Sequence, residues 1–192
     1  LVGPEESAAP KAGAFSQHAD EGRITRRCDP DPVWAKLAGR SMDNYSKIEE
    51  ASGVTFHRPV GFLAVGHAAG SFIQRVASVG EAAGMPLRGP LDKSVLREDF
   101  PFLHLGEENV GLVEDGQRLG AGLISPRALV QAQCKLFSRA GGHIIRDVVE
   151  SVSYADRNGN SGSAAGGLEE EPLLRVDLRT ARGAPLYARR VL

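Results

Sequence analysis

Residues 31–53 read DPVWAKLAGRSMDNYSKIEEASG and carry the clearest helix signal in the chain. Asp31 can cap the first turn, and Pro32 suits the first helical position because its missing N–H is not needed there. Apolar side chains then recur at helical spacing as far as Gly53, which can adopt the left-handed conformation that closes a helix. They are Trp34, Leu37, Ala38, Met42, Tyr45 and Ile48. The segment predicts one long helix with this apolar face.

Short strands and further helices are expected on both sides of this helix. Periodicity and turn residues predict helices at 70–83 and 126–140, with a helical turn at 94–99. Residues 4–22, most of 86–109 and 155–167 are expected to be irregular. The predicted strands lie at 55–57, 60–65, 110–113, 122–124, 143–145, 148–153, 173–178 and 186–192. This order of elements predicts an α/β chain.

The composition excludes partners that are bound through bulk charge. The 192 residues carry 23 Lys and Arg against 24 Asp and Glu, so the formal net charge is −1. We therefore expect no nucleic acid and no anionic membrane surface as a partner. The longest strongly apolar stretch, residues 60–65, falls far short of the roughly 20 residues that cross a bilayer, which predicts a soluble chain.

The common metal, redox and nucleotide motifs are missing from the sequence. The five histidines show no HExxH or HxxxH pairing, so no metal site is expected. Cys28 and Cys134 form no CxxC pair, which indicates a reducing compartment. Residues 120–125, GAGLIS, imitate a dinucleotide fingerprint, but Ser125 replaces the third glycine and Pro126 follows it. A hairpin end that leads into a capped helix is the better interpretation.

Residues 16–27, SQHADEGRITRR, hold a dense cluster of charged side chains. Arg23, Arg26 and Arg27 lie within five residues, beside His18 and two carboxylates. Such a cluster can be a solvated loop with internal ion pairs, which contributes little to stability or function. It can also form a site for a small anionic ligand, because arginine offers a planar, permanently charged, bidentate partner for a carboxylate.

Residues 16–26 resemble the S-x-H-G-x-[ST]-R-I-x-R region of the sarcosine oxidase-like, FAD-dependent amino-acid oxidoreductases, a family with glycine oxidase and D-amino-acid oxidase as more distant relatives. The similarity continues through the helix that carries Trp34. The order and spacing of the segments carry the resemblance, which extends over residues 16–153. Further segments similar to family motifs are RPVGFLAVG at 58–66, REDFP at 97–101, GLISPRAL at 122–129 and GGHII at 141–145.

The resemblance implies the fold and its division into domains. It implies a fragment of an FAD-binding, Rossmann-like domain interleaved with an antiparallel-sheet substrate domain. Residues 1–53 and 141–192 would belong to the FAD-binding domain, and residues 54–140 to the substrate-binding domain. The glycine-rich turn that grips the FAD pyrophosphate would precede Leu1, and the covalent-flavin cysteine would follow Leu192. We therefore expect an internal fragment that binds FAD weakly and is inactive by itself.

The resemblance also implies an enzyme that oxidises the C–N bond of an amino acid or N-methyl amino acid. Hydride would pass to FAD, the imine would hydrolyse, and oxygen would reoxidise the flavin. Arg23 matches the family arginine beside the flavin ring, Arg26 the arginine that binds the substrate carboxylate, and His18 the active-site histidine. The expected partners are thus a small amino-acid or amine substrate and oxygen.

Three further positions are implied in cofactor binding, together with Arg23. Val149 matches the valine whose backbone meets the adenine of FAD, and Gly22 stands where the family has a Ser or Thr hydroxyl. Glu5 is the stand-in for the acid that binds the ribose. The alternative function, from another class, is a non-catalytic remnant of the family that keeps the fold as a binding or interaction module.

Overall fold

The computed structural model describes residues 1–3, 22–155, 161–162, 174–178 and 186–188. The chain divides into two compact units, one of residues 15–136 and the other of residues 1–14 and 137–192. Most of the loop predicted at 4–22 lies outside the described residues, as do His18 and Glu5. Within the described part of the chain, none of the helices combines the length and the apolar character that crossing a bilayer requires.

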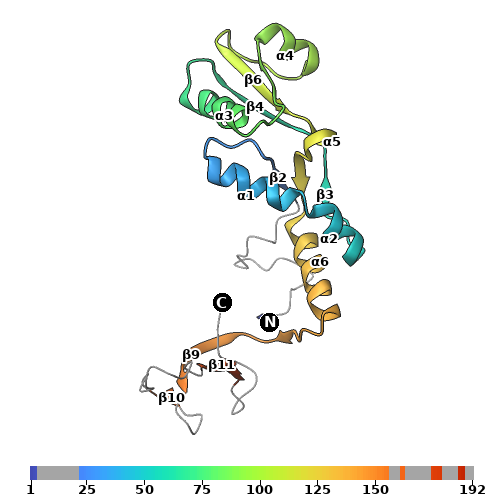
Figure 1. Ribbon diagram of the computed structural model, residues 1–192, viewed down its shortest axis with the longest axis vertical. Helices are drawn as coiled ribbons and strands as arrows, with labels where there is room; N and C mark the ends of the chain where they lie inside the picture. Colours follow the sequence, from blue (N-terminus) through green and yellow to red (C-terminus); the bar gives the residue numbers. More distant parts are fainter. Residues whose placement is uncertain (4–21, 156–160, 163–173, 179–185, 189–192) are drawn as a thin grey trace. The chain divides into compact units, whose positions relative to one another are not determined.

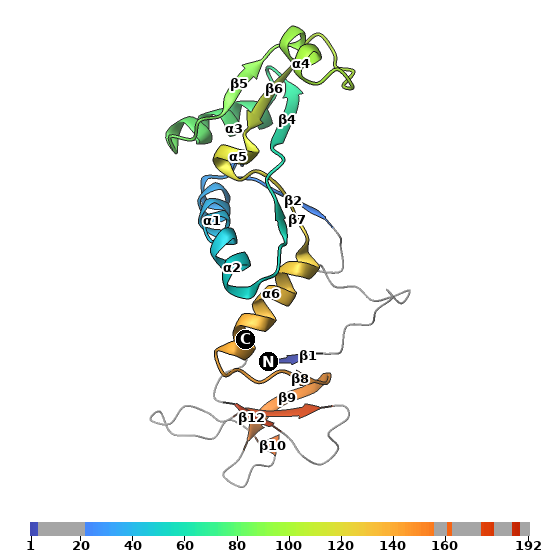
Figure 2. The same ribbon diagram turned by 90° about the vertical axis from the view of Figure 1, so that its right-hand side faces the viewer.

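Two small antiparallel sheets form the centre of the 15–136 unit. In the first, β7 (Gly122–Ile124) lies between β2 (Arg23–Thr25) and β3 (His57–Arg58). In the second, β6 (Asn109–Glu114) lies between β4 (Phe62–His67) and β5 (Arg88–Leu91). The chain passes between the sheets twice, from β3 to β4 and from β6 through the short helix α5 (Gly116–Leu119) to β7 (Figure 2).

The described part of the chain also contains five helices longer than α5, of which α3 lies beside β4 (Figure 1). Two hydrophobic clusters result. One joins the second sheet to α3 through Cys28, Ala64, Ile73, Val76 and Leu112. The other joins Met42, Tyr45, Phe56 and Ala132. The helices are α1 (Pro32–Met42), α2 (Tyr45–Ser52), α3 (Ser71–Ala82), α4 (Lys93–Asp99) and α6 (Pro126–Arg139).

The prediction of one long helix over residues 31–53 is wrong in one respect, because the helix is interrupted after Met42. The Asn44 side-chain amide donates to the Arg40 carbonyl at 2.8 Å, and such local bonds compete with the helical ladder. Both predicted ends are confirmed. Asp31 accepts from the N–H groups of the first turn, and Gly53 closes α2 with a φ of 67°.

The apolar face predicted for this helix also needs correction. Trp34 is 64% exposed and Leu37 is 46% exposed, whereas Ala35 and Met42 are buried. The small side chain of Ala35 allows close packing of α1, so the large neighbours are left on the outer face. Similarly, α3 buries Ile73 and Val76 and leaves Phe72 exposed.

The structure contains two strands where irregular chain was predicted. β5 pairs with β6 through a register shift between Arg88 and Leu91, which accommodates Gly89 and Pro90. β10 (Ser161–Gly162) pairs with residues 154 and 155 inside the predicted loop. The interpretation of residues 120–125 is confirmed in part. They lead through β7 into α6, where the Ser125 hydroxyl accepts from the Ala128 N–H at 3.2 Å as a helix cap. The predicted hairpin is wrong, because β7 pairs with β2 and β3, whereas β6 belongs to the other sheet.

The other unit contains a parallel pair and an antiparallel sheet. β1 (Val2–Gly3) pairs in parallel with β8 (Ile145–Arg146). The sheet has the order β10-β9-β11-β12, formed with β9 (Val149–Ala155), β11 (Leu174–Leu178) and β12 (Leu186–Ala188). The mixed α/β class with antiparallel sheets is thus confirmed. The Rossmann-like character and the functional domains at 1–53, 54–140 and 141–192 stay predictions.

Candidate functional site

The arginine-rich segment begins in β2 at the edge of the first sheet. Arg23 and Ile24 are exposed, whereas Thr25 is buried and its hydroxyl lies 3.2 Å from the Tyr45 hydroxyl. β7 fixes the strand by antiparallel pairing, with Arg23 opposite Ile124. β2 therefore anchors the segment through Thr25 and leaves its first arginine accessible.

Arg26 follows β2 directly, and its side chain is only 30% exposed. Its Nη2 donates to Asp29 at 3.1 Å, and its guanidinium carbon lies 5.2 Å from the centre of the Phe62 ring. Its Nε is buried and has no hydrogen-bond partner among the described residues. A ligand oxygen can therefore reach only the exposed part of the guanidinium, which keeps N–H donors beyond the one that Asp29 accepts.

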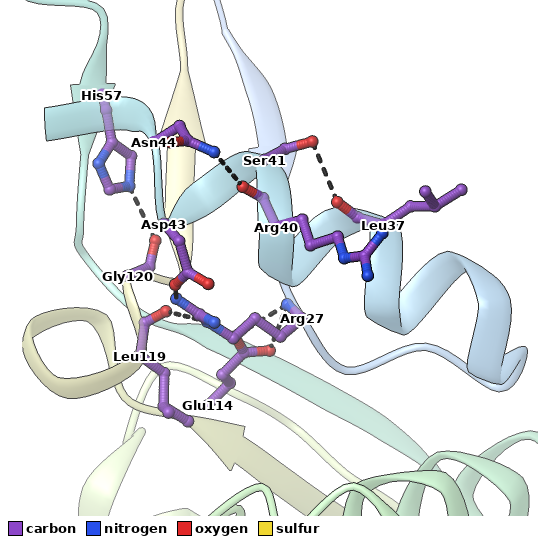
Figure 3. Close-up of polar contacts among 10 residues, drawn as sticks. All are labelled: Arg27, Leu37, Arg40, Ser41, Asp43, Asn44, His57, Glu114, Leu119 and Gly120. Atoms are coloured by element: carbon purple, nitrogen blue, oxygen red, sulfur yellow. Dashed lines mark hydrogen bonds and ion pairs between the residues drawn. The ribbon is translucent and has the colours of Figure 1, made fainter. Parts of the chain in front are cut away.

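Arg27 and the buried Glu114 hold the chain just after Arg26 (Figure 3). Glu114 is 0% exposed, and its carboxylate accepts from the backbone N–H of Arg27 at 2.9 and 3.0 Å and from that of Cys28 at 2.8 Å. The Arg27 guanidinium donates to the Leu119 carbonyl and to the Asp43 carboxylate, each at 2.7 Å. The backbone of residues 27 and 28 is therefore fixed from two sides.

The environment of Cys28 disfavours its thiolate. Burial raises the pKa of this thiol from 9.0 to about 12, and the neighbouring Glu114 carboxylate contributes in the same direction. A nucleophilic cysteine needs an accessible thiolate. Cys28 therefore serves as a small buried side chain in this core, where it is 2% exposed.

A second, partly buried polar network lies where β3 begins. Glu49 accepts from the backbone N–H of Phe56 at 2.7 Å and from that of His57 at 2.8 Å. The His57 Nε2 lies 2.8 Å from the Gly120 carbonyl oxygen, and its ring is 5.1 Å from that of Tyr45. These bonds satisfy the backbone where β3 begins, and they involve none of the arginines.

A groove of about 630 Å³ lies in the same unit, between α1 and the end of α3. Its walls are mainly apolar, with Pro32, Ala35, Val79 and Met85 among them. Arg27 also lines it, but the guanidinium of that residue is engaged by Leu119 and Asp43. Arg23 and Arg26 are not among its lining residues.

The predicted site residues fall into three groups. Gly22, Arg23 and Arg26 lie together in the 15–136 unit, at and beside β2. Val149 begins β9 in the other unit and is 43% exposed. His18 and Glu5 lie outside the described residues. The functions assigned to all of these residues stay predictions.

Sequence reasoning missed Glu114, Phe62 and Asp29, which contact the arginine segment. Phe62 and Glu114 come from strands far along the chain, so nothing near residue 26 indicates them. The sequence did contain one signal for Glu114, which directly follows the apolar run 110–113. If that run forms a buried strand, the carboxylate at its end is buried too and needs hydrogen-bond donors. No group of three potential metal ligands occurs within the described segments.

Sequence comparison identifies no relative of the chain, because neither a protein-family model nor a curated protein sequence matches it. Solved structures do match. NikD, described as an unusual amino acid oxidase essential for nikkomycin biosynthesis, has a TM-score of 0.64 at 15% identity over 92% of this chain. Glycine oxidase from Geobacillus kaustophilus has a TM-score of 0.60 at 18% identity over 92% of this chain.

A third match is L-proline dehydrogenase from P. horikoshii, with a TM-score of 0.54 at 17% identity over 69% of this chain. The chain spans 41% of NikD, 44% of the glycine oxidase and 34% of the proline dehydrogenase. At these identities the likeness concerns the fold. The chain is thus similar in fold to less than half of each of three enzymes that act on amino acids, and the family resemblance stated from the sequence is confirmed at this level.

Proposed function

We propose that this protein is an FAD-dependent oxidoreductase that oxidises the C–N bond of an amino acid or an N-methyl amino acid. Two lines support the proposal: the family-like order of motifs over residues 16–153, and the shared fold with two amino acid oxidases and L-proline dehydrogenase. The single observation that carries it is the state of Arg26: Asp29 and the Phe62 ring hold its guanidinium, the side chain is 30% exposed, and only one of its N–H groups is used by a described residue.

Arg26 suits the recognition of a substrate carboxylate. Asp29 and the Phe62 ring orient the guanidinium without occupying all of its donors. A carboxylate can accept two parallel N–H bonds from such a fork, and the partial burial strengthens each of them. Arg26 therefore binds the acid end of the substrate and holds the carbon bearing the nitrogen in a fixed direction.

The residues at the start of β2 fit a flavin. Arg23 is an exposed residue on a strand that β7 fixes. Among the described residues, none apart from the chain neighbours comes within 4 Å of the position that a Cβ at Gly22 would take. When bound, FAD supplies the acceptor for the hydride leaving the carbon next to the nitrogen, and oxygen then reoxidises it.

The chain itself contributes binding and electrostatics in this function. Arg23 provides a permanent positive charge that stabilises negative charge developing beside it during oxidation. The imine product then hydrolyses in water. Val149 at the adenine, Glu5 at the ribose and His18 in the active site complete the proposed assignments, on the strength of the family resemblance.

The test uses the protein expressed from its own gene and purified under native conditions. We expect a visible flavin spectrum that bleaches on anaerobic addition of sarcosine, glycine or L-proline. Arg26→Ala should weaken binding of the oxidised amino acid by about 2 kcal/mol, roughly thirtyfold in KM, because a charge-assisted bond is lost.

The matched control is Arg88→Ala, which removes an exposed arginine paired with Asp99 in the same unit. This variant should leave KM unchanged. A protein that binds the amino acids through Arg26 but takes up no flavin would instead support the non-catalytic binding module. An unchanged KM in Arg26→Ala would remove Arg26 from the site.

A further inference from the structure

We propose that Glu114 is the positioning residue of the site: its buried carboxylate fixes the backbone after Arg26 so that the guanidinium is presented to the substrate carboxylate. The inference rests on the proposed function, since it takes Arg26 as the substrate-binding arginine. Glu114 touches neither the substrate nor the reacting atoms in this proposal, and it acts through the peptide bonds on the C-terminal side of Arg26.

Among the described residues, the carboxylate of Glu114 bonds to one short segment, residues 27 and 28, through two backbone N–H groups and the Cys28 thiol. It accepts from two N–H groups, those of Arg27 and Cys28, which lie 87 and 86 positions away in the sequence. The side chain is 0% exposed. An ionised carboxylate that receives backbone N–H groups forms charge-assisted bonds, which are about twice as strong as neutral ones.

These bonds act at the point that decides the direction of Arg26. The N–H of Arg27 belongs to the peptide that follows the Arg26 Cα, so its orientation fixes the ψ angle of Arg26. Antiparallel pairing of β2 with β7 fixes the backbone on the other side. Arg26 therefore lies between two restrained peptides, and its rotamer is set by Asp29 and Phe62.

Arg27 provides a second anchor for the backbone segment that carries Arg26. Its guanidinium reaches the Leu119 carbonyl on α5 and Asp43 at the end of α1 (Figure 3). Glu114 itself ends β6, the middle strand of the second sheet. The turn that carries Arg26 is thus tied to both sheets and to α1, which gives the preorganisation that a binding arginine requires.

The test compares Glu114→Gln with Glu49→Gln in the protein expressed from its own gene. A glutamine keeps one acceptor oxygen but turns an NH₂ toward a backbone N–H, so it disrupts the pair of bonds. Glu49 is the matched control because it also accepts from two backbone N–H groups in the same unit, at Phe56 and His57. It makes no bond to the arginine segment.

We expect Glu114→Gln to raise KM about tenfold for whichever of sarcosine, glycine and L-proline is oxidised. The inhibition constant of the matching amine without a carboxylate (dimethylamine, methylamine or pyrrolidine) should not change. Faster hydrogen exchange at the Arg27 and Cys28 amides should accompany this effect. Glu49→Gln should lower stability and leave KM unchanged. If Glu114→Gln does not fold, the same measurements on Glu114→Asp decide, since aspartate keeps the charge but shortens the reach.

Three outcomes separate the two proposals. If Arg26→Ala raises KM and both Glu114 variants leave it unchanged, the positioning role is overturned and the proposed function stands. If Glu114→Gln and the control Glu49→Gln raise KM equally, a general loosening of the fold explains the effect and the positioning role is again overturned. If Arg26→Ala has no effect on KM, the assignment of Arg26 fails first.

Discussion

Arg26 and Phe62 form a cation–π pair in which the guanidinium carbon lies 5.2 Å from the centre of the ring. Phe62 is the first residue of β4, so the contact links the arginine segment to the second sheet. The ring face restrains the guanidinium without using any of its N–H donors. The Phe62 ring therefore helps to orient the Arg26 guanidinium, and the N–H groups of the guanidinium stay available for hydrogen bonds apart from the one that Asp29 accepts.

Phe62→Leu should weaken recognition of the substrate carboxylate while retaining an apolar side chain under Arg26. We expect a loss of about 1 kcal/mol, or roughly fivefold in KM, because the cation–π contact is removed and the hydrogen bonds remain. Steady-state kinetics measure this change. Phe102→Leu is the control, since that ring is 73% exposed and pairs only with Phe100 among the described residues, and its KM should match the parent.

The two cysteines should differ in their reactivity in the folded protein. Because the pKa of Cys28 is raised to about 12, its thiolate is scarce at mildly alkaline pH. Cys134 lies half-buried on α6. Iodoacetamide should therefore modify Cys134 first, as read by peptide mass spectrometry, and reach Cys28 only after unfolding. Rapid labelling of Cys28 in the native protein would contradict this burial.

The same thiol makes stability depend on pH in the alkaline range. The unfolded chain ionises Cys28 near 9.0, whereas the folded state keeps the proton until about 12. The free energy of unfolding should thus fall as the pH rises from 9.0 toward 12, because the unfolded state binds fewer protons there. Denaturant titrations measure this slope. Cys28→Ala should reduce it, and an equal slope in that variant would argue against the raised pKa.

Gly116 and Gly39 should respond oppositely to replacement by alanine. A Cβ at Gly116 would overlap the backbone of Pro59 and Gly61, whereas one at Gly39 would meet only Arg27 Nη1 at 3.5 Å. We expect Gly116→Ala to lower the free energy of unfolding by about 2 kcal/mol or more. Gly39→Ala, inside α1, should raise it by up to about 1 kcal/mol. Equal effects of the two changes in urea titrations would refute the close packing at Gly116.

Local signals in the sequence were sufficient to locate most element ends. Asp31 and Gly53 mark helix boundaries in the sequence and in the structure, because a cap depends on residues within one turn. The face of a helix that becomes buried depends on what packs against it. Trp34 therefore lies on the exposed side of α1, although its spacing is that of a core residue.

The arginine cluster by itself left two interpretations open, a solvated loop and an anion site, and the family resemblance favoured the second. The structure shows Arg26 partly buried, with N–H donors that no described residue accepts. Its supports, Phe62 and Glu114, come from distant strands whose meeting depends on sheet pairing. The same applies to β5, where pairing with β6 overrides the turn-like residues Gly89 and Pro90.

The position of Glu114 also restricts where this protein can gain or lose residues during evolution. The acid ends β6, and α5 begins two residues later at Gly116, where no side chain fits. One residue inserted between Val113 and Glu114 would shift the acid by one position in the β6 register, turn it out of the interior and separate it from its amide partners. Length variation among homologues should accordingly accumulate in the exposed stretch around Gly106, while this junction keeps a constant length.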